Sequence, residues 1–369
     1  MVFRLQGLTM DSTGARVLVY WVTETWGIQS NEIMTMNKIY DFKVLAVYAD
    51  HLLAACGYRI DKYSLEGKWL GYVGTLEDKK YGKWAGHKLT RRLMRAEITA
   101  LYKLEDGAML AIAKKGFFRK EKGEQMFRKV FSTPRGSKPL NICFTKDGCA
   151  YFGEYFQNVE KAEVHVYGSE DGCRTWKVVY TFAAGNINHV HGLFLDPYTD
   201  RIWIATGDRE NECIIGWTED GFETLHEVLR GGQEYRSCQL FFYKDFIVYA
   251  TDSQYIENEI RAIDRETLEI TFLTKIQGSA IKGGQMGDVA YLSTTVEPSD
   301  VNRDKYSYVW VSRGGRKWNE LFEAEKDCYP SMLQYATVEF PQHHAIADCL
   351  YFSGRAVKGL DGRTTYEKI

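Results

Sequence analysis

The 369-residue sequence lacks three features that would assign it quickly. It has no excess of positive charge, because 47 Lys and Arg stand against 49 Asp and Glu, so we expect no nucleic-acid partner. It has no apolar run of about 18 residues and no secretory signal pattern, so we expect a cytoplasmic protein without a membrane partner. Its eight cysteines form no C-x-x-C pair, which argues against a zinc knuckle or redox site and favours buried thiols.

The sequence contains a repeated short apolar segment that opens with a charged residue or Gly. The seven copies start at Asp50, Gly107, Gly148, Arg201, Asp245, Asp288 and Asp348. Their mean spacing is about 50 residues, which is typical of a four-stranded propeller blade. Each copy is too short for a helix and is flanked by turn residues, so we interpret each as a buried strand.

This repeat predicts an all-β fold, a seven-bladed β-propeller formed by residues 1–369 as a single domain. Each blade is expected to run from an inner strand to the repeat strand, a third strand, a hairpin and a fourth strand. A strand at about residues 14–21 is expected to join the last blade, at about residues 330–369, and to close the ring. A six-bladed ring with one extra hairpin is the alternative.

Two hairpins between predicted third and fourth strands carry a recognisable pattern. The segment 169–176 reads SEDGCRTW, and Ser169, Asp171, Thr175 and Trp176 match the pattern S-x-D-x-G-x-T-W. A weaker copy contains Asp220, 49 residues after Asp171. These segments resemble the Asp-box, or BNR repeat, of sialidase-like propellers. The resemblance implies structural roles for these residues and an active site on the opposite face. The chain is not a clear sialidase, because the full arginine triad of that family cannot be assigned.

The propeller order predicts which residues meet at the face opposite the hairpins. The ends of the repeat strands and the entries to the inner strands should surround one shared opening. Residues two apart in a strand share a face, so His189 and His191 should point the same way. The expected catalytic residues are His189, His191, Glu154, Asp208 and Tyr155, and the expected substrate-binding residues are Arg236, Tyr235, Gln233, Asp252, Arg355, His343 and His344.

Three functions stay open at this point. Glycoside hydrolysis of an acidic glycan needs two carboxyl groups, or a Tyr backed by Glu, and is the favoured interpretation. A polysaccharide lyase would use His, Tyr and Arg side chains on the same kind of acidic oligo- or polysaccharide. A propeller that only binds a glycan or a protein is the third. The sequence assigns no cofactor, although His189, His191 and Asp208 form a possible divalent metal site. The alternative for these residues is structural, with hydrogen bonds to neighbouring loops and salt links to arginine.

Overall fold

The computed structural model describes residues 3–10, 16–22 and 38–369. The chain divides into two compact units, Met1–Ile39 and Tyr40–Ile369. In the first unit, β1 (Phe3–Met10) pairs with β2 (Arg16–Val22) in an antiparallel two-stranded sheet, with Phe3 opposite Val22.

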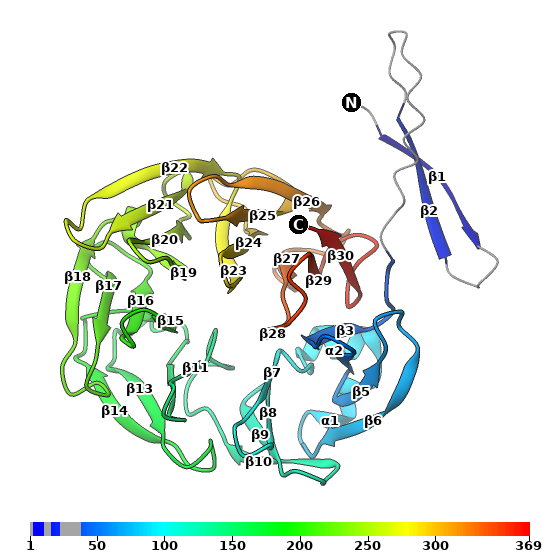
Figure 1. The fold of residues 1–369 in the computed structure, drawn as a ribbon, viewed down its shortest axis with the longest axis horizontal. Helices are drawn as coiled ribbons and strands as arrows, with labels where there is room; N and C mark the ends of the chain where they lie inside the picture. Colours follow the sequence, from blue (N-terminus) through cyan, green and yellow to red (C-terminus); the bar gives the residue numbers. More distant parts are fainter. Residues whose placement is uncertain (1–2, 11–15, 23–37) are drawn as a thin grey trace. The chain divides into compact units, whose positions relative to one another are not determined.

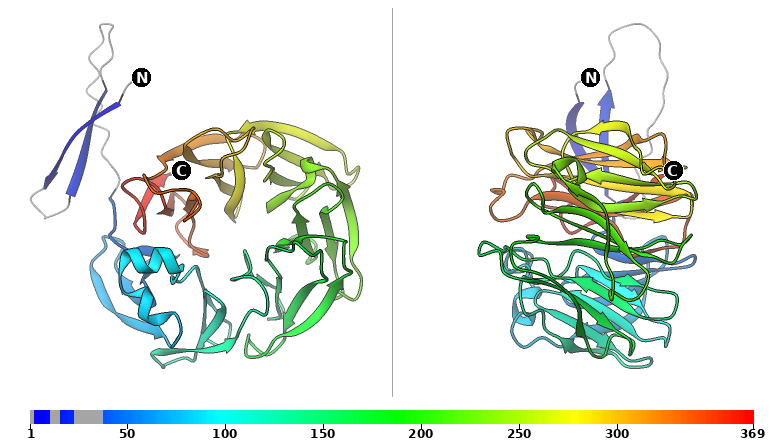
Figure 2. Two further views of the ribbon diagram at one scale, coloured as in Figure 1. Left: turned by 180° about the vertical axis from the view of Figure 1, so that it is seen from behind. Right: turned by 90° about the vertical axis from the view of Figure 1, so that its left-hand side faces the viewer.

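The second unit is a ring of consecutive antiparallel groups of strands around a central axis (Figure 1). Figure 2 shows this ring from behind and from the side. The first four groups are β3 (Lys43–Val47), β4 (Leu52–Cys56), β5 (Arg59–Tyr63) and β6 (Trp69–Leu76); β7 (Ala100–Lys103), β8 (Met109–Ala113), β9 (Gly116–Lys120) and β10 (Met126–Phe131); β11 (Cys143–Phe144), β12 (Ala150–Gly153), β13 (Val164–Ser169) and β14 (Lys177–Phe182); β15 (His189–Leu195), β16 (Ile202–Gly207), β17 (Cys213–Thr218) and β18 (His226–Gly231). Three more follow: β19 (Ser237–Phe242), β20 (Phe246–Thr251), β21 (Asn258–Asp264) and β22 (Ile270–Ile276); β23 (Ser279–Met286), β24 (Val289–Val296), β25 (Tyr306–Arg313) and β26 (Asn319–Glu325); β27 (Ala336–Glu339), β29 (Cys349–Arg355) and β30 (Thr364–Lys368), with the short β28 (His343–His344) between β27 and β29.

The all-β propeller prediction is confirmed, and each repeat segment forms the second strand of its group. These strands are β4, β8, β12, β16, β20, β24 and β29. They are almost wholly buried, because each has neighbouring strands on both edges and packs against adjacent groups on its faces. The two short helices, α1 (Gly82–Ala85) and α2 (Lys88–Met94), lie between β6 and β7. The helix α2 ends where Arg95 adopts a left-handed conformation with φ of 51°.

Aromatic side chains fill the spaces between neighbouring groups of strands. Phe117 contacts Phe152 and Trp176 edge to face, with ring centroids 4.9 Å and 5.2 Å apart. All eight cysteines are free, as expected. Cys56 and Cys328 are nevertheless exposed, and Cys149 and Cys349 are half-buried, so the prediction of buried thiols holds for only four of the eight.

The ring closes through contacts within residues 40–369. The short β28 pairs in parallel with β3, with His343 opposite Ala46, and Tyr40 forms an isolated bridge with Thr364. The outer partner of β29 is β30, near the C-terminal end. The closing strand predicted at about residues 14–21 falls largely on β2, which pairs with β1 in the first unit, and its junction with the last group stays a prediction.

The hairpin that follows β13 is organised by one carboxylate. Oδ1 of Asp171 accepts hydrogen bonds from the backbone N–H groups of Arg174 (2.9 Å) and Thr175 (3.0 Å), and Oδ2 accepts one from the Thr175 hydroxyl (2.6 Å). In the next group, Asp220 accepts a bond from the Thr224 N–H at 3.0 Å. Partial burial would raise the pKa of Asp171, but the bonds from Thr175 and Ser169 outweigh it and lower the pKa to about 2. Both aspartates therefore stabilise turns, as predicted.

We expect Asp171→Asn to lower the melting temperature at neutral pH. The pKa of Asp171 in the folded chain lies below its ordinary value, so this stabilisation is present above about pH 4 and is lost as the pH falls toward 2. Melting curves of the variant and the parent should therefore converge in acid. A difference that persists at pH 2 would contradict the assignment.

Candidate functional site

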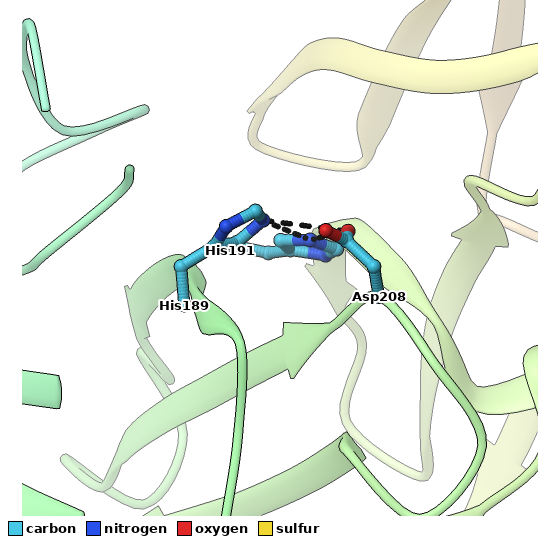
Figure 3. A group of neighbouring side chains, drawn as sticks. All are labelled: His189, His191 and Asp208. Atoms are coloured by element: carbon cyan, nitrogen blue, oxygen red, sulfur yellow. Dashed lines mark hydrogen bonds and ion pairs between the residues drawn. The ribbon is translucent and has the colours of Figure 1, made fainter. Parts of the chain in front are cut away.

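Two histidines begin the first strand of the fourth group, at the end of the ring where second strands finish. We call this end the upper face. His189 pairs with Gly207 at the end of β16, and Asp208 follows directly. His189 and His191 are both buried and point the same way, as their spacing predicted, and Asp208 faces them (Figure 3). The Nε2 atoms of the two rings are 3.1 Å apart.

Backbone carbonyls set the orientation and tautomer of both rings. Nδ1 of His189 lies 2.9 Å from the Phe156 carbonyl oxygen, and Nδ1 of His191 lies 3.0 Å from that of Ser237. A carbonyl oxygen only accepts, so these contacts are hydrogen bonds when each Nδ1 carries a hydrogen and donates it; the Asn188 amide nitrogen is farther from Nδ1 of His189, at 3.3 Å. In the neutral rings, both Nε2 atoms then present lone pairs.

Oδ1 of Asp208 lies at the point where these lone pairs meet. It is 3.1 Å from Nε2 of His191 and 3.3 Å from Nε2 of His189. Three acceptor atoms at such distances repel one another unless a positive charge lies among them. Arg236 Nη2, 2.9 Å from Oδ1, supplies positive charge on one side of the carboxylate, and the charge between the two Nε2 atoms is either a proton on an imidazole or a bound cation.

The three atoms have the spacing of ligands on one small metal ion. Ligand atoms at about 2.1 Å from a metal ion are about 3.0 to 3.4 Å apart when the angle between them is about 90° to 109°. The distances of 3.1, 3.1 and 3.3 Å fall in this range. Two imidazoles and one carboxylate suit zinc, iron or manganese. The carbonyls that hold each Nδ1–H are the usual outer partners of metal-bound histidine.

Asp208 is ionised and held from several sides. Burial would raise its pKa, but an imidazole of His189 or His191 that carries a proton on Nε2 and donates it to Asp208 outweighs burial and holds the pKa of this carboxyl well below its ordinary value. Asn188 donates to Oδ2 at 2.7 Å, and Arg236 Nη2 lies 2.9 Å from Oδ1. The predicted residue Gln233 donates to the Asp208 carbonyl oxygen at 2.8 Å, so it positions the carboxylate's backbone.

A second carboxylate, Asp252, lies next to this group. Its Oδ2 accepts a bond from the Cys238 thiol at 3.2 Å and lies 3.7 Å from Arg236 Nη2. Its Oδ1 is buried and has no hydrogen-bond partner among the described residues. His191, Cys238 and Asp252 also form a cluster whose ligand atoms lie within 4.8 Å of one another. The site therefore holds one fully bonded carboxylate and one with a free oxygen.

Tyr155 covers the histidines. Its ring centroid is 4.2 Å from that of His189 and 6.2 Å from that of His191. Burial, followed by the nearby Cys238 and Asp252, raises the pKa of its hydroxyl well above the ordinary value. This phenol stays protonated at neutral pH and so can donate a proton.

Other predicted site residues have different roles. The carbonyl oxygen of Glu154 accepts the Val190 N–H between the two histidines at 2.9 Å, but its side chain is engaged elsewhere. Glu154 is bound by Arg135 and accepts a bond from the His165 N–H at 3.0 Å, which makes its role structural. Arg355 forms ion pairs with Glu97 and Glu339. Tyr235 ends the short helix η1 (Gln233–Tyr235), and its ring lies against Gly231.

His343 and His344 differ most from their predicted place. They were expected at the entry to an inner strand on the upper face. That inner strand is β27, which precedes them, and both histidines lie in the connection from β27 to β29. His343 is paired with Ala46, toward the end of β3, and stacks near Tyr48 with ring centroids 4.7 Å apart. Burial, followed by His343, lowers the pKa of His344 to about 4, and its Nε2 accepts the Tyr351 N–H. The pair is therefore structural.

Sequence reasoning missed two contributors to the site. Cys238 had been assigned only as a buried thiol, although it follows Arg236 by two residues and so shares its side of the chain. Glu297 lies in the loop after β24, and burial together with Asp252 raises the pKa of its carboxyl. No repeat position marks Glu297, because upper-face loops vary in length between groups.

Comparison with known proteins gives the fold and not the family. No family model matches the chain, and no curated protein matches it. A catalytically inactive variant of virginiamycin B lyase from Staphylococcus aureus, crystallised with quinupristin, is 13% identical over the whole of both chains, with a TM-score of 0.55. The WD40 β-propeller domain of Doa1 is 11% identical over 89% of this chain and 94% of that one, with a TM-score of 0.52. The extracellular domain of the B. thetaiotaomicron one-component system BT4673 is 9% identical over 99% of this chain and 52% of its own, with a TM-score of 0.55.

These likenesses agree with the ring of strands and establish a propeller. Within the described residues, no helix has the length and apolar character needed to cross a bilayer.

We expect Asp208→Asn to lower stability by about 1 to 3 kcal/mol at neutral pH. The amide cannot balance the charge of the buried Arg236, which keeps the longer ion pair to Asp252 and a hydrogen bond to the carbonyl oxygen of residue 208. Denaturant unfolding of the variant and the parent measures the difference. Equal midpoints would show that Arg236 does not depend on Asp208.

Proposed function

We propose that this propeller is an enzyme that cleaves an acidic glycan at the upper face, with a divalent cation held by His189, His191 and Asp208. The observation that carries the proposal is the convergence of three lone pairs, from two Nε2 atoms and Oδ1, within 3.3 Å. A cation there would neutralise the carboxylate of a uronic acid and acidify the adjacent C–H group. The resemblance of residues 169–176 to the Asp-box supports a carbohydrate substrate.

Elimination suits the site better than hydrolysis by a pair of carboxyl groups. Of the carboxyl groups predicted for hydrolysis, Glu154 is bound to Arg135 and Asp208 is held ionised. Neither is free to act as a protonated acid. The alternative in which Tyr155 is the nucleophile and Glu154 assists it is not supported either, because Glu154 is bound to Arg135.

The described residues supply both proton transfers of an elimination. A carboxylate oxygen of Asp252 lies within 4.8 Å of a His191 ring nitrogen, and its Oδ1 is free to accept the proton released from carbon. The protonated Tyr155 donates to the departing glycosidic oxygen as the C–O bond breaks and the C=C bond forms. Solvent then returns both groups to their starting states.

A glycoside hydrolase is the second candidate, and one observation favours it. The pKa of Glu297 is raised while that of Asp208 is lowered, and Asp208 is among the groups that act on Glu297. Two carboxyl groups with pKa values pushed apart are typical of an acid and its ionised partner.

A panel of acidic and neutral oligosaccharides, assayed for reducing ends and for ultraviolet absorbance of an unsaturated uronide, separates the candidates. Both signals together support the lyase, reducing ends alone support the hydrolase, and saturable binding without either signal identifies a binding module. We expect His191→Ala to reduce the rate by about 100-fold or more. His226→Ala, an exposed histidine on β18, is the matched control and should keep full activity.

Metal binding has its own test. Isothermal titration of chelator-treated protein with Zn²⁺ or Mn²⁺ should give one tight site in the parent and in His226→Ala. His189→Ala and His191→Ala should each lose it. A titration that shows no site in the parent would leave a shared proton as the positive charge and would overturn the role of the cation.

A further inference from the structure

A second group of charged side chains joins β3, β27 and β29 and includes none of the residues of the histidine site. Lys43 at the start of β3 is 2.6 Å from Glu339 at the end of β27. Arg355 at the end of β29 is 3.1 Å from Glu97 and 2.5 Å from Glu339. Two cations and two carboxylates therefore balance one another.

Two further lysines, Lys138 and Lys282, line a cavity beside this group. The cavity has a volume of about 40 Å³, room for about three water molecules. Its walls come from β7 and β8, from the segment before β11, from β23 and from the segment 339–342, so it lies between groups on different sides of the ring. Within residues 38–369, no hydrogen bond or ion pair joins either amine to a carboxylate.

The positive charge of these lysines is not balanced. Burial, followed by repulsion from Lys282 and Arg355, holds the pKa of Lys138 well below its ordinary value. Burial also lowers the pKa of Lys282, although Glu339 acts in the opposite direction. Lys43, Lys138, Lys282 and Arg355 outnumber Glu97 and Glu339 by two charges when all are ionised, and unbalanced charge among partly buried side chains is unfavourable.

We propose that this cavity binds a tetrahedral oxyanion of the phosphate or sulfate class between Lys138 and Lys282. A dianion would supply the two missing negative charges and accept hydrogen bonds from both amines. The cavity is also lined by Gln342, whose amide can donate to an anion, and by Glu339, whose carboxylate is engaged by Lys43 and Arg355. The site goes beyond the proposed function, because it uses none of the residues that hold the cation at the upper face.

The test is calorimetric titration and thermal melting with inorganic phosphate, at an ionic strength held constant with chloride. We expect one saturable site in the parent, weakened about 10-fold or more in Lys138→Met and in Lys282→Met. Lys244→Met, an exposed lysine in the β19–β20 hairpin, is the matched control and should bind as the parent does. Without phosphate, Lys138→Met should melt at the same temperature as the parent or higher, because a repulsive charge is removed.

Two results would overturn the proposal. One is a parent that shows no saturable binding of phosphate or sulfate. The other is a phosphate-dependent rise in melting temperature that is as large in Lys138→Met as in the parent. If Lys138→Met does not fold, Lys138→Gln replaces it and is judged by the same two criteria.

A second arm finds the source of the anion. A monosaccharide sulfate ester that binds as tightly as inorganic sulfate would place an anionic group of a glycan in the cavity. Binding of the free ions alone would identify a site for an inorganic ion. Because neither arm involves His189, His191 or Asp208, failure of this site is distinguishable from failure of the proposed cleavage.

Discussion

The upper-face site depends on two hydrogen bonds to backbone carbonyl oxygens, those of Phe156 and Ser237. They come from the groups of strands on either side of β15, and each fixes the hydrogen of one imidazole on Nδ1. With both hydrogens directed away, the Nε2 lone pairs can only face each other and Asp208. The chemistry of the site therefore follows from how neighbouring groups of the ring pack, because that packing places the two carbonyls.

The same packing explains why the upper face tolerates so much buried charge. Arg236 lies between Asp208 and Asp252. Burial would lower the pKa of its guanidinium, but Asp252 and Asp208 outweigh burial and raise the pKa above its ordinary value. A row of alternating charges costs less to bury than any one member would alone. One oxygen of Asp252 and Nε of Arg236 remain without partners among the described residues, so the row is not complete without a polar group from outside.

The repeat made most of the ring predictable from sequence. Each second strand has a buried apolar segment bounded by turn residues, and that local signal survives in all seven groups. The last group was harder, because its first strand, Ala336–Glu339, has only four residues and no turn residue marks it. The prediction placed the entry to the inner strand at the more conspicuous His343 and His344, several residues too far along the chain. Ring closure is a contact between distant parts of the sequence, and no local pattern specifies it.

The candidate site was predictable where the spacing of residues along a strand determines which way their side chains point. His189 and His191 are two residues apart on a strand whose end meets the end of β16, so their approach to Asp208 follows from the repeat. The choice between a structural and a functional carboxylate did not follow, because it depends on long-range partners. Glu154 forms an ion pair with Arg135, which lies in a loop with no repeat counterpart, whereas Asp208 faces two imidazoles. Folding stability alone would not favour a carboxylate that faces lone pairs as well as cations. Its presence on the upper face, opposite the turn-forming Asp171 and Asp220, argues that this end of the ring is shaped by what it binds and the other end by stability.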